Sequence, residues 1–215
     1  MARIFIDDSI DNSLIDGLIL SDAYIAPIRG KALNCNFRLN QKIGHQDWLE
    51  NIKNRFDSLN IRSTIYKSIR NNSTFGFHFY DCLYAQNHKL FTIMRERWYL
   101  DGEKIVPDDL KLTPLVLADW ICGDGSTGWT KLNLASNILF HTESFSHIDI
   151  LKLIKLLKEL DFSPWIRCRN TCKGEIIGLS RSHEVKKLLQ GIDKFIPPYF
   201  KYKIKIPVGL SRSEA

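Results

Sequence analysis

The chain has 215 residues, of which 44% are hydrophobic and 25% charged, the ordinary balance of a soluble globular protein. No apolar run approaches the roughly 18 residues that cross a bilayer, so the composition excludes a membrane-spanning helix and predicts no membrane partner. With 30 Lys and Arg against 24 Asp and Glu, the net charge of +6 favours a polyanionic partner such as nucleic acid.

The predicted elements of the first half follow the order helix, strand, helix, strand, strand, helix. After a short N-terminal arm, an apolar helix is expected from Ser13, a suitable N-cap, to Asp22. The elements that follow are expected at residues 33–40, 44–59, 61–70, 74–80 and 81–97. Residues 100–109 are rich in turn-forming types and predict a connector.

Each predicted strand of this half alternates between an apolar and a polar face. The inward set is Leu33, Cys35, Phe37, Leu39, Ile61, Ile65, Ile69, Phe75, Phe77 and Phe79. The outward set includes Asn34, Asn36, Arg38, Asn40, Arg62, Thr64, Tyr66, Arg70, His78 and Tyr80. Because amide and guanidinium groups can read base edges, we expect the outward set to contact nucleic acid.

The second half repeats the same order. Its elements are expected at residues 113–124, 132–139, 143–160, 163–172, 175–180 and 182–195. The residues expected to contact nucleic acid here are Asn133, Arg167, Arg169 and Lys173. The sequence thus predicts an α+β fold of two pseudo-symmetric α-β-α-β-β-α repeats. We expect domains at residues 1–99 and 113–215, joined by a linker at 100–112.

Two aspartates occupy equivalent places in the repeats. Asp124 ends the helix that opens the second half, where the helix dipole disfavours a carboxylate by about 0.3–1 kcal/mol. Asp22 ends the first helix, 102 residues earlier. Two carboxylates near a twofold axis repel each other, and a divalent metal would relieve that repulsion.

Two lysines follow the same repeat. Lys104 lies 82 residues after Asp22, and Lys203 lies 79 residues after Asp124. A metal held by carboxylates, with lysines beside it, is suited to cleavage of phosphodiester bonds. Together with the polar strand faces, this set of residues predicts an enzyme that cuts DNA.

The residues around the two aspartates resemble a known signature. The stretch Leu117-Ala-Asp-Trp-Ile-Cys-Gly-Asp-Gly125 resembles the nine-residue motif of the LAGLIDADG homing endonucleases, and Ile15-Asp-Gly-Leu-Ile-Leu-Ser-Asp-Ala23 resembles a weaker first copy. Over residues 13–207 the layout is similar to the single-chain, two-motif branch typified by mitochondrial intron-encoded enzymes.

This resemblance implies a fold and a mechanism. The motif helices would pack side by side, and each repeat would lay a saddle-shaped antiparallel sheet along the major groove of a long DNA site. Asp22 and Asp124, with the main-chain carbonyls of Ser21 and Gly123, would hold Mg²⁺, for which Mn²⁺ would substitute. Lys104 and Lys203 match the active-site lysines. A monomer would cut both strands across the minor groove and leave short 3′ overhangs.

Some alternatives remain open at this stage. Asp119 aligns with Gly17 on the face between the motif helices, and it either faces solvent or has a partner. An RNA maturase that assists splicing of its own intron, with host intron RNA as its partner, is a second reading of the same fold, and a catalytically silent DNA-binding regulator is a third. The presence of both aspartates favours cleavage. The target sequence stays open, as does the host, an organelle or a bacterial or phage cytoplasm.

Overall fold

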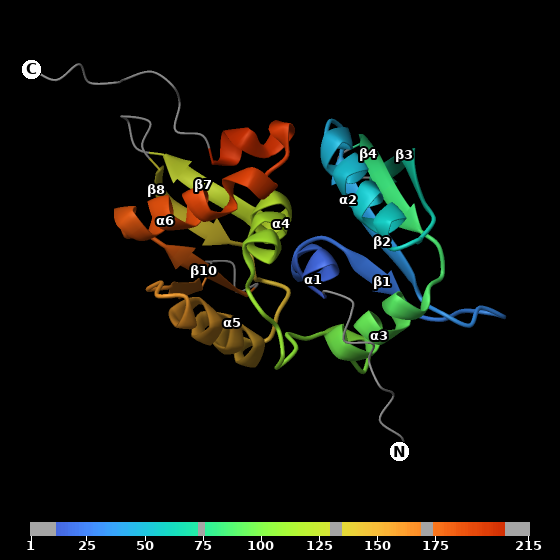
Figure 1. The fold of residues 1–215 in the computed structure, drawn as a ribbon, viewed down its shortest axis with the longest axis horizontal. Coiled ribbons are helices and arrows are strands. Elements are labelled where there is room, and N and C mark those ends of the chain that lie inside the picture. The colour runs from blue at the N-terminus through green and yellow to red at the C-terminus, as the bar shows by residue number, and fades with distance from the viewer. Residues whose placement is uncertain (1–11, 73–75, 130–134, 169–173, 205–215) are drawn as a thin grey trace, which may run out of the picture.

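The computed structural model describes residues 12–72, 76–129, 135–168 and 174–204. Within these ranges it forms two halves of similar topology, with the helices α1 and α4 side by side between them (Figure 1). None of the helices in the described ranges is long and apolar enough to cross a membrane.

The first half contains a four-stranded antiparallel sheet in the order β1-β2-β4-β3. Its elements are α1 (Ser13–Leu20), β1 (Tyr24–Ala26), β2 (Asn36–Lys42), α2 (Gln46–Ser58), β3 (Ser63–Asn72), β4 (Gly76–Ala85), α3 (Lys89–Trp98), β5 (Tyr99–Leu100) and β6 (Glu103–Lys104). Strands β5 and β6 form a short hairpin that ends at Lys104.

The second half repeats this topology with the strand order β7-β8-β10-β9. Its elements are α4 (Pro114–Asp124), β7 (Gly125–Trp129), β8 (Ala135–Phe140), α5 (His147–Glu159), β9 (Trp165–Cys168), β10 (Glu175–Leu179), α6 (Ser182–Ile192), and the 3₁₀ helices η1 (Asp193–Phe195) and η2 (Pro198–Lys203). The predicted α+β fold with two antiparallel repeats is confirmed. Each four-stranded sheet has one strand more than expected, β1 or β7, and the β5–β6 hairpin of the first half was not predicted either.

The core is centred on the two motif helices. Every residue of α4 from Val116 to Cys122 is buried, and so is most of α1. The helices approach closely at Gly17, where an added Cβ would lie 2.6 Å from the carbonyl oxygen of Val116. At the other end, a Cβ on Gly123 would lie 2.5 Å from the Cβ of Ser21. Glycine at these two positions therefore allows the close approach of the two helices.

Asp119 on α4 has a buried partner. Its carboxylate accepts two hydrogen bonds from the Arg55 guanidinium of α2, at 2.5 and 2.8 Å. The Trp48 indole nitrogen lies 3.5 Å from the same carboxylate. The open question about Asp119 is thus settled in favour of a pair, and that pair joins the two halves.

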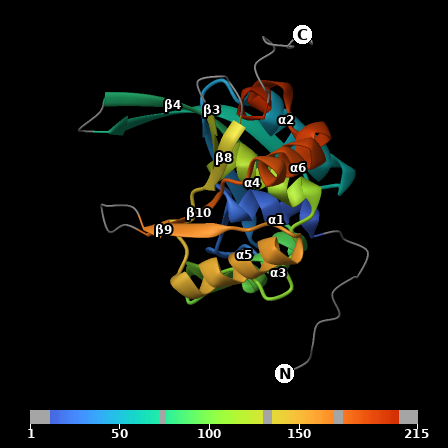
Figure 2. The same ribbon diagram turned by 90° about the vertical axis from the view of Figure 1, so that its left-hand side faces the viewer.

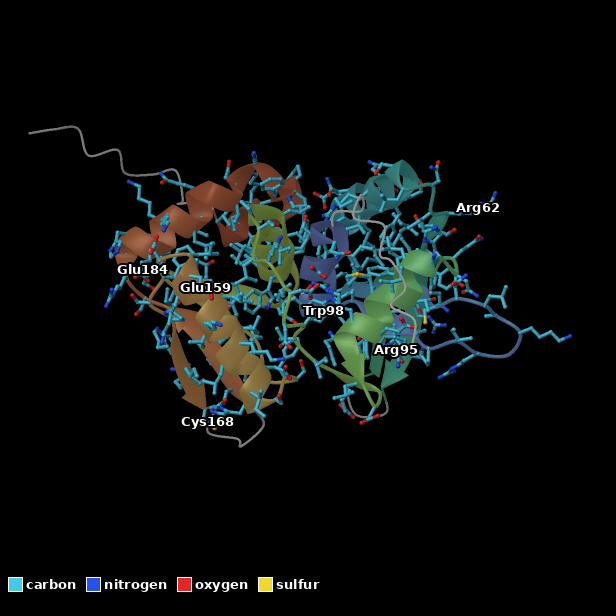
Figure 3. All side chains as sticks on the ribbon, turned by 60° about the horizontal axis from the view of Figure 1, so that its bottom comes forward. Arg62, Arg95, Trp98, Glu159, Cys168 and Glu184 are labelled. Carbon is cyan, nitrogen blue, oxygen red and sulfur yellow. The ribbon has the colours of Figure 1, made fainter. Side chains whose placement is uncertain are left out.

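A similar arrangement holds Asp16 on α1. Its carboxylate forms an ion pair with Arg97 of α3 and accepts a hydrogen bond of 2.8 Å from the indole of Trp98. Figure 3 shows Trp98 in the interior of the molecule. Each motif helix therefore has one buried carboxylate that is satisfied by an arginine and approached by a tryptophan.

The predicted burial of four residues of the first half was wrong. The side chains of Ile69, Phe77 and Phe79 are 60%, 68% and 51% exposed, although they lie on the core side of their strands. The β3–β4 hairpin projects beyond the helices that cover the rest of the sheet, so none of the described helices covers its end (Figure 2). Leu33, predicted inward, is exposed because β2 begins only at Asn36. Phe75 lies outside the described residues.

The helix predicted at residues 81–97 was also wrong at its start. Residues 81–85 continue β4, and α3 begins at Lys89. His88 ends the extended segment, because its Nδ1 accepts a hydrogen bond of 3.2 Å from the Leu90 amide and so caps the helix.

Candidate active site

Asp22 and Asp124 meet at the ends of the two motif helices. Asp124 is the last residue of α4, and Asp22 follows the C-cap of α1. A Cβ on Gly123 would lie 3.3 Å from the carboxylate of Asp22. Burial, together with the negative charge of Asp22, raises the pKa of Asp124 to about 7. The structure therefore brings the two predicted carboxylates together, as the repeat suggested.

Neither carboxylate has an ion-pair partner in the part of the chain that the structure describes. Asp22 accepts a hydrogen bond of 2.6 Å from the side-chain amide of Gln41, a buried residue of β2. Sequence reasoning missed Gln41, because the predicted strand ended at residue 40. Its position on the inward, otherwise apolar face of the strand was the signal that could have identified it.

The two lysines contact the main chain at the ends of the motif helices. The Lys104 amine donates to the carbonyl oxygens of Ile19, Ser21 and Ala23, at 2.8, 3.0 and 3.4 Å. The Lys203 amine donates to the carbonyl oxygens of Ile121, Cys122 and Gly125, at 2.9, 2.8 and 2.9 Å.

These contacts have an electrostatic consequence. A positive charge at a helix C-terminus complements the helix dipole and satisfies carbonyls that have no partner within the helix. Burial lowers the pKa of both Lys104 and Lys203, while the two aspartates oppose that shift. The lysines thus offset the dipole penalty at Asp22 and Asp124 without pairing with the carboxylates themselves.

The donor set of the site fits a hard divalent cation. Two adjacent carboxylates that lack an ion pair supply negative charge and oxygen atoms, as Mg²⁺ requires. The described residues include no group of three or more His, Cys, Asp and Glu side chains that could enclose a metal. Two carboxylates alone suit Mg²⁺, which usually keeps several waters and takes its other ligands from substrate phosphates. The Ser21 carbonyl, an expected ligand, already accepts one hydrogen bond from Lys104.

The predicted polar residues of the first half line up across the sheet. Strand pairing places Arg38 beside Tyr24 and Tyr84, and Arg70 beside His78. The resulting row, called here the polar face of the first sheet, consists of Tyr24, Asn36, Arg38, Asn40, Lys42, Thr64, Tyr66, Ser68, Arg70, His78, Tyr80 and Tyr84. Four of these, Tyr24, Lys42, Ser68 and Tyr84, were not predicted; the alternation that identified their neighbours extends to them.

Two predicted residues lie outside this row. Asn34 precedes β2, and its side chain accepts a hydrogen bond of 3.2 Å from Thr92 of α3. Arg62 is exposed on the outer flank of the first half, just before β3 (Figure 3). Neither residue therefore belongs to the paired strands that define this face.

Among the described residues, the corresponding face of the second sheet carries apolar side chains beside Arg167. Trp165 of β9 lies over Gly178, where a Cβ would come within 2.2 Å of the indole. The Arg167 guanidinium is 5.8 Å from the centre of the same ring, and Arg167 pairs with Ile176. The predicted residues Asn133, Arg169 and Lys173 lie outside the described residues.

The sequence matches known proteins. The LAGLIDADG DNA endonuclease family matches residues 12–186. An uncharacterised protein of Methanocaldococcus jannaschii is 32% identical over 196 residues, which cover 90% of this chain and 72% of that protein. The cytochrome b mRNA maturase bI2 of Debaryomyces hansenii is 28% identical over 117 residues, or 53% of this chain and 42% of the maturase.

Solved structures share the fold. The homing endonuclease I-WcaI, bound to its DNA recognition sequence, superposes with a TM-score of 0.77 at 21% identity, covering 90% of this chain and 85% of that one. The LAGLIDADG meganuclease I-AabMI, bound to uncleaved DNA, gives 0.53 at 11% identity, covering 90% and 87%. Since the family match spans most of the sequence and includes both motif helices, the chain belongs to the LAGLIDADG DNA endonuclease family.

Proposed function

We propose that this endonuclease binds a long, specific site on duplex DNA as a monomer and cuts both strands at the paired aspartates. One observation carries the proposal: Asp22 and Asp124 are held together at the ends of α1 and α4, and among the described residues neither has an ion pair. A single chain suffices, since each half contributes one aspartate, one lysine and one sheet.

A divalent metal is part of the proposal. Asp22 and Asp124 would hold it, with the main-chain oxygens of Ser21 and Gly123 as further ligands. Bound there, the metal would activate water and stabilise the charge that develops on the phosphate and the leaving oxygen. Variants of the homing endonuclease I-DmoI, similar in fold at TM-scores of 0.50 and 0.53, were solved with target DNA in the presence of Mg and Mn. We therefore propose Mg²⁺, with Mn²⁺ as a substitute.

The side chains around the aspartates would orient the reaction. Lys104 and Lys203 hold the helix ends and place positive charge beside the phosphates, where negative charge accumulates in the transition state. Gln41 keeps the Asp22 carboxylate in one orientation. Breakage of the bond to the 3′ oxygen on each strand, across the minor groove, would leave short 3′ overhangs.

The sheets would hold the DNA. The polar face of the first sheet offers arginine, asparagine and lysine side chains, which can bond to guanine, adenine and phosphate. Arg70 lies over the ring of Tyr80, 5.2 Å from its centre, and this contact restricts the guanidinium before DNA binds. We propose that Arg167 and the predicted polar residues of the second half contact the other half of the site.

Aspartate substitution tests the proposal. Target DNA would be selected from a randomised plasmid library and then cut with Mg²⁺ by the wild-type chain and by Asp22→Asn and Asp124→Asn. We expect both variants to lose double-strand cleavage and to keep their affinity for DNA. Cleavage retained by either variant would contradict the metal assignment, and a wild-type chain that cuts no library member would contradict the proposed function.

A maturase activity is the second candidate, and the similarity to the maturase bI2 favours it. An intron RNA partner would be detected as tight, saturable binding of the host intron transcript that accelerates its splicing. The two activities are compatible. Asp22→Asn and Asp124→Asn are expected to abolish DNA cleavage alone, so the variants separate one activity from the other.

A further inference from the structure

The motif aspartates are not the only acidic pair with this spacing. Asp47 and Asp149 are also 102 residues apart, and each lies in the first turn of a helix, α2 or α5. Asp47 accepts a hydrogen bond of 2.9 Å from the Tyr199 amide. Asp149 accepts one of 3.0 Å from the Val106 amide. In both cases the amide belongs to the segment that carries an active-site lysine, and the carboxylate belongs to a helix of the other half.

Asp149 and its neighbours fix the main chain next to Lys104. Val106 is two residues after Lys104, and Lys152 of α5 also donates to the Val106 carbonyl at 2.9 Å. The ring of Phe145, which precedes α5, lies 5.8 Å from the Lys104 amine. Asp149 is itself almost fully buried and accepts a hydrogen bond of 2.6 Å from Ser146, the N-cap of α5. The carboxylate that holds the main chain next to Lys104 is thus itself fixed by the N-terminal cap of α5.

Asp47 and its neighbours fix η2, the segment that ends with Lys203. Phe200 is fully buried against Trp48 and His45, at ring-centre distances of 5.2 and 4.7 Å. The Lys203 amine lies 5.1 Å from the Phe200 ring centre. Within its own half, Lys203 is held by the hydroxyl of Thr127, which donates to its carbonyl at 2.6 Å. Residues of the first half therefore pack against the segment that carries Lys203 of the second half.

We propose that Asp47 and Asp149 are crossed positioning residues: each fixes the main chain that carries the lysine of the opposite half. Each lysine in turn holds the end of one motif helix and so the direction of one motif aspartate. This inference rests on the proposed function. As a consequence, the lysine of each half is positioned by the first turn of a helix from the other half, α5 for Lys104 and α2 for Lys203. The rates at which the two DNA strands are cut would therefore depend on each other.

Strand-resolved cleavage tests the crossing. A duplex labelled on either strand would be cut by wild type, Asp47→Ala and Asp149→Ala. We expect each variant to slow one strand on the order of 10–100-fold, and the two variants to slow opposite strands, so that nicked DNA accumulates with opposite polarity. Asp47→Asn and Asp149→Asn keep an acceptor oxygen, so we expect the ratio of the two strand cleavage rates to return close to that of the wild type. The matched controls are Asp57→Ala on α2 and Glu159→Ala on α5, which remove exposed i,i+4 pairs and should leave the strand ratio unchanged.

Hydrogen–deuterium exchange gives a readout that does not need activity. Asp149→Ala should speed amide exchange at residues 103–106 and leave residues 198–203 unchanged, and Asp47→Ala should do the reverse. If the wild-type chain cuts DNA but both variants slow the two strands equally, or exchange changes in neither segment, the crossed positioning is wrong. If the exchange pattern is crossed while the wild-type chain cuts no DNA, the positioning holds and the proposed function fails.

Discussion

Lys203 donates to three main-chain carbonyls, so its charge is fixed at the end of α4. Lys203→Met keeps most of the length of the apolar stem and removes the charged amine. We expect cleavage to slow about 10–100-fold while the dissociation constant for DNA changes little, because the amine is held at the carbonyls that end α4 and would act on the charge that develops in the transition state. Single-turnover cleavage rates and binding isotherms would measure the two effects.

Lys201 provides the control for that substitution. It lies two residues earlier in η2, and its amine pairs at 2.8 Å with Asp193, the C-cap of α6, in place of the carbonyls that end α4. Lys201→Met should leave the cleavage rate near that of wild type. If Lys203→Met lowers the DNA affinity and the cleavage rate by the same factor, Lys203 contributes to DNA binding and has no separate effect on the cleavage step.

Arg55 and Asp119 form an ion pair buried between the halves. Arg55→Met leaves the Asp119 carboxylate buried without a counter-charge, so we expect the free energy of unfolding to fall by about 3–5 kcal/mol. Adding Asp119→Leu removes the stranded charge and should recover most of that loss. Urea unfolding of the two variants would measure this, and a single Arg55→Met variant as stable as wild type would contradict the assigned role.

At the scale of residues, the repeat in the sequence predicted which four side chains the structure brings together. Asp22, Asp124, Lys104 and Lys203 lie together because the two halves fold alike. The partner of Asp119 could not be predicted, because Arg55 is 64 residues away in the sequence and on another helix.

At the scale of elements, the spacing of α1 and α4 depends on Gly17. A Cβ there would lie 2.8 Å from the Cβ of Asp119 and closer still to main chain, so the helices must separate. We expect Gly17→Ala to destabilise the protein by about 1–3 kcal/mol, although alanine is the better helix former, and to slow cleavage by displacing Asp22 from Asp124. Thermal unfolding and cleavage rates would measure both effects.

Gly191 in α6 is the matched control, since nothing lies within 4 Å of an added Cβ. Gly191→Ala should stabilise the protein by up to about 1 kcal/mol and leave cleavage unchanged. If Gly17→Ala behaves in the same way, the close approach of the motif helices does not constrain the site.

Elements with strong periodicity, such as α2 and α5, were predicted in type and approximate place, and the alternating faces of β2 were predicted correctly from Asn36 onward. Strands β1 and β7 were missed because β1 has three residues and β7 is rich in glycine, serine and threonine. The alternation in β3 and β4 gave the correct faces, but it could not show where the covering helices end. Burial of Phe77 and Phe79 was therefore predicted wrongly.

At the scale of the whole molecule, the net charge of +6 and the polar face of the first sheet predict salt-dependent binding. Each phosphate contact releases condensed counterions, so affinity for DNA should fall on the order of 10³-fold or more between 50 and 200 mM salt.

Arg70→Ala should reduce the slope of log affinity against log salt by about 1 if Arg70 contacts a phosphate. Lys187 of α6, which donates to the Leu160 carbonyl, is the control, and Lys187→Ala should leave the slope unchanged. Fluorescence anisotropy at five salt concentrations would give the slopes, and a flat profile for the wild-type chain would contradict binding through a basic saddle.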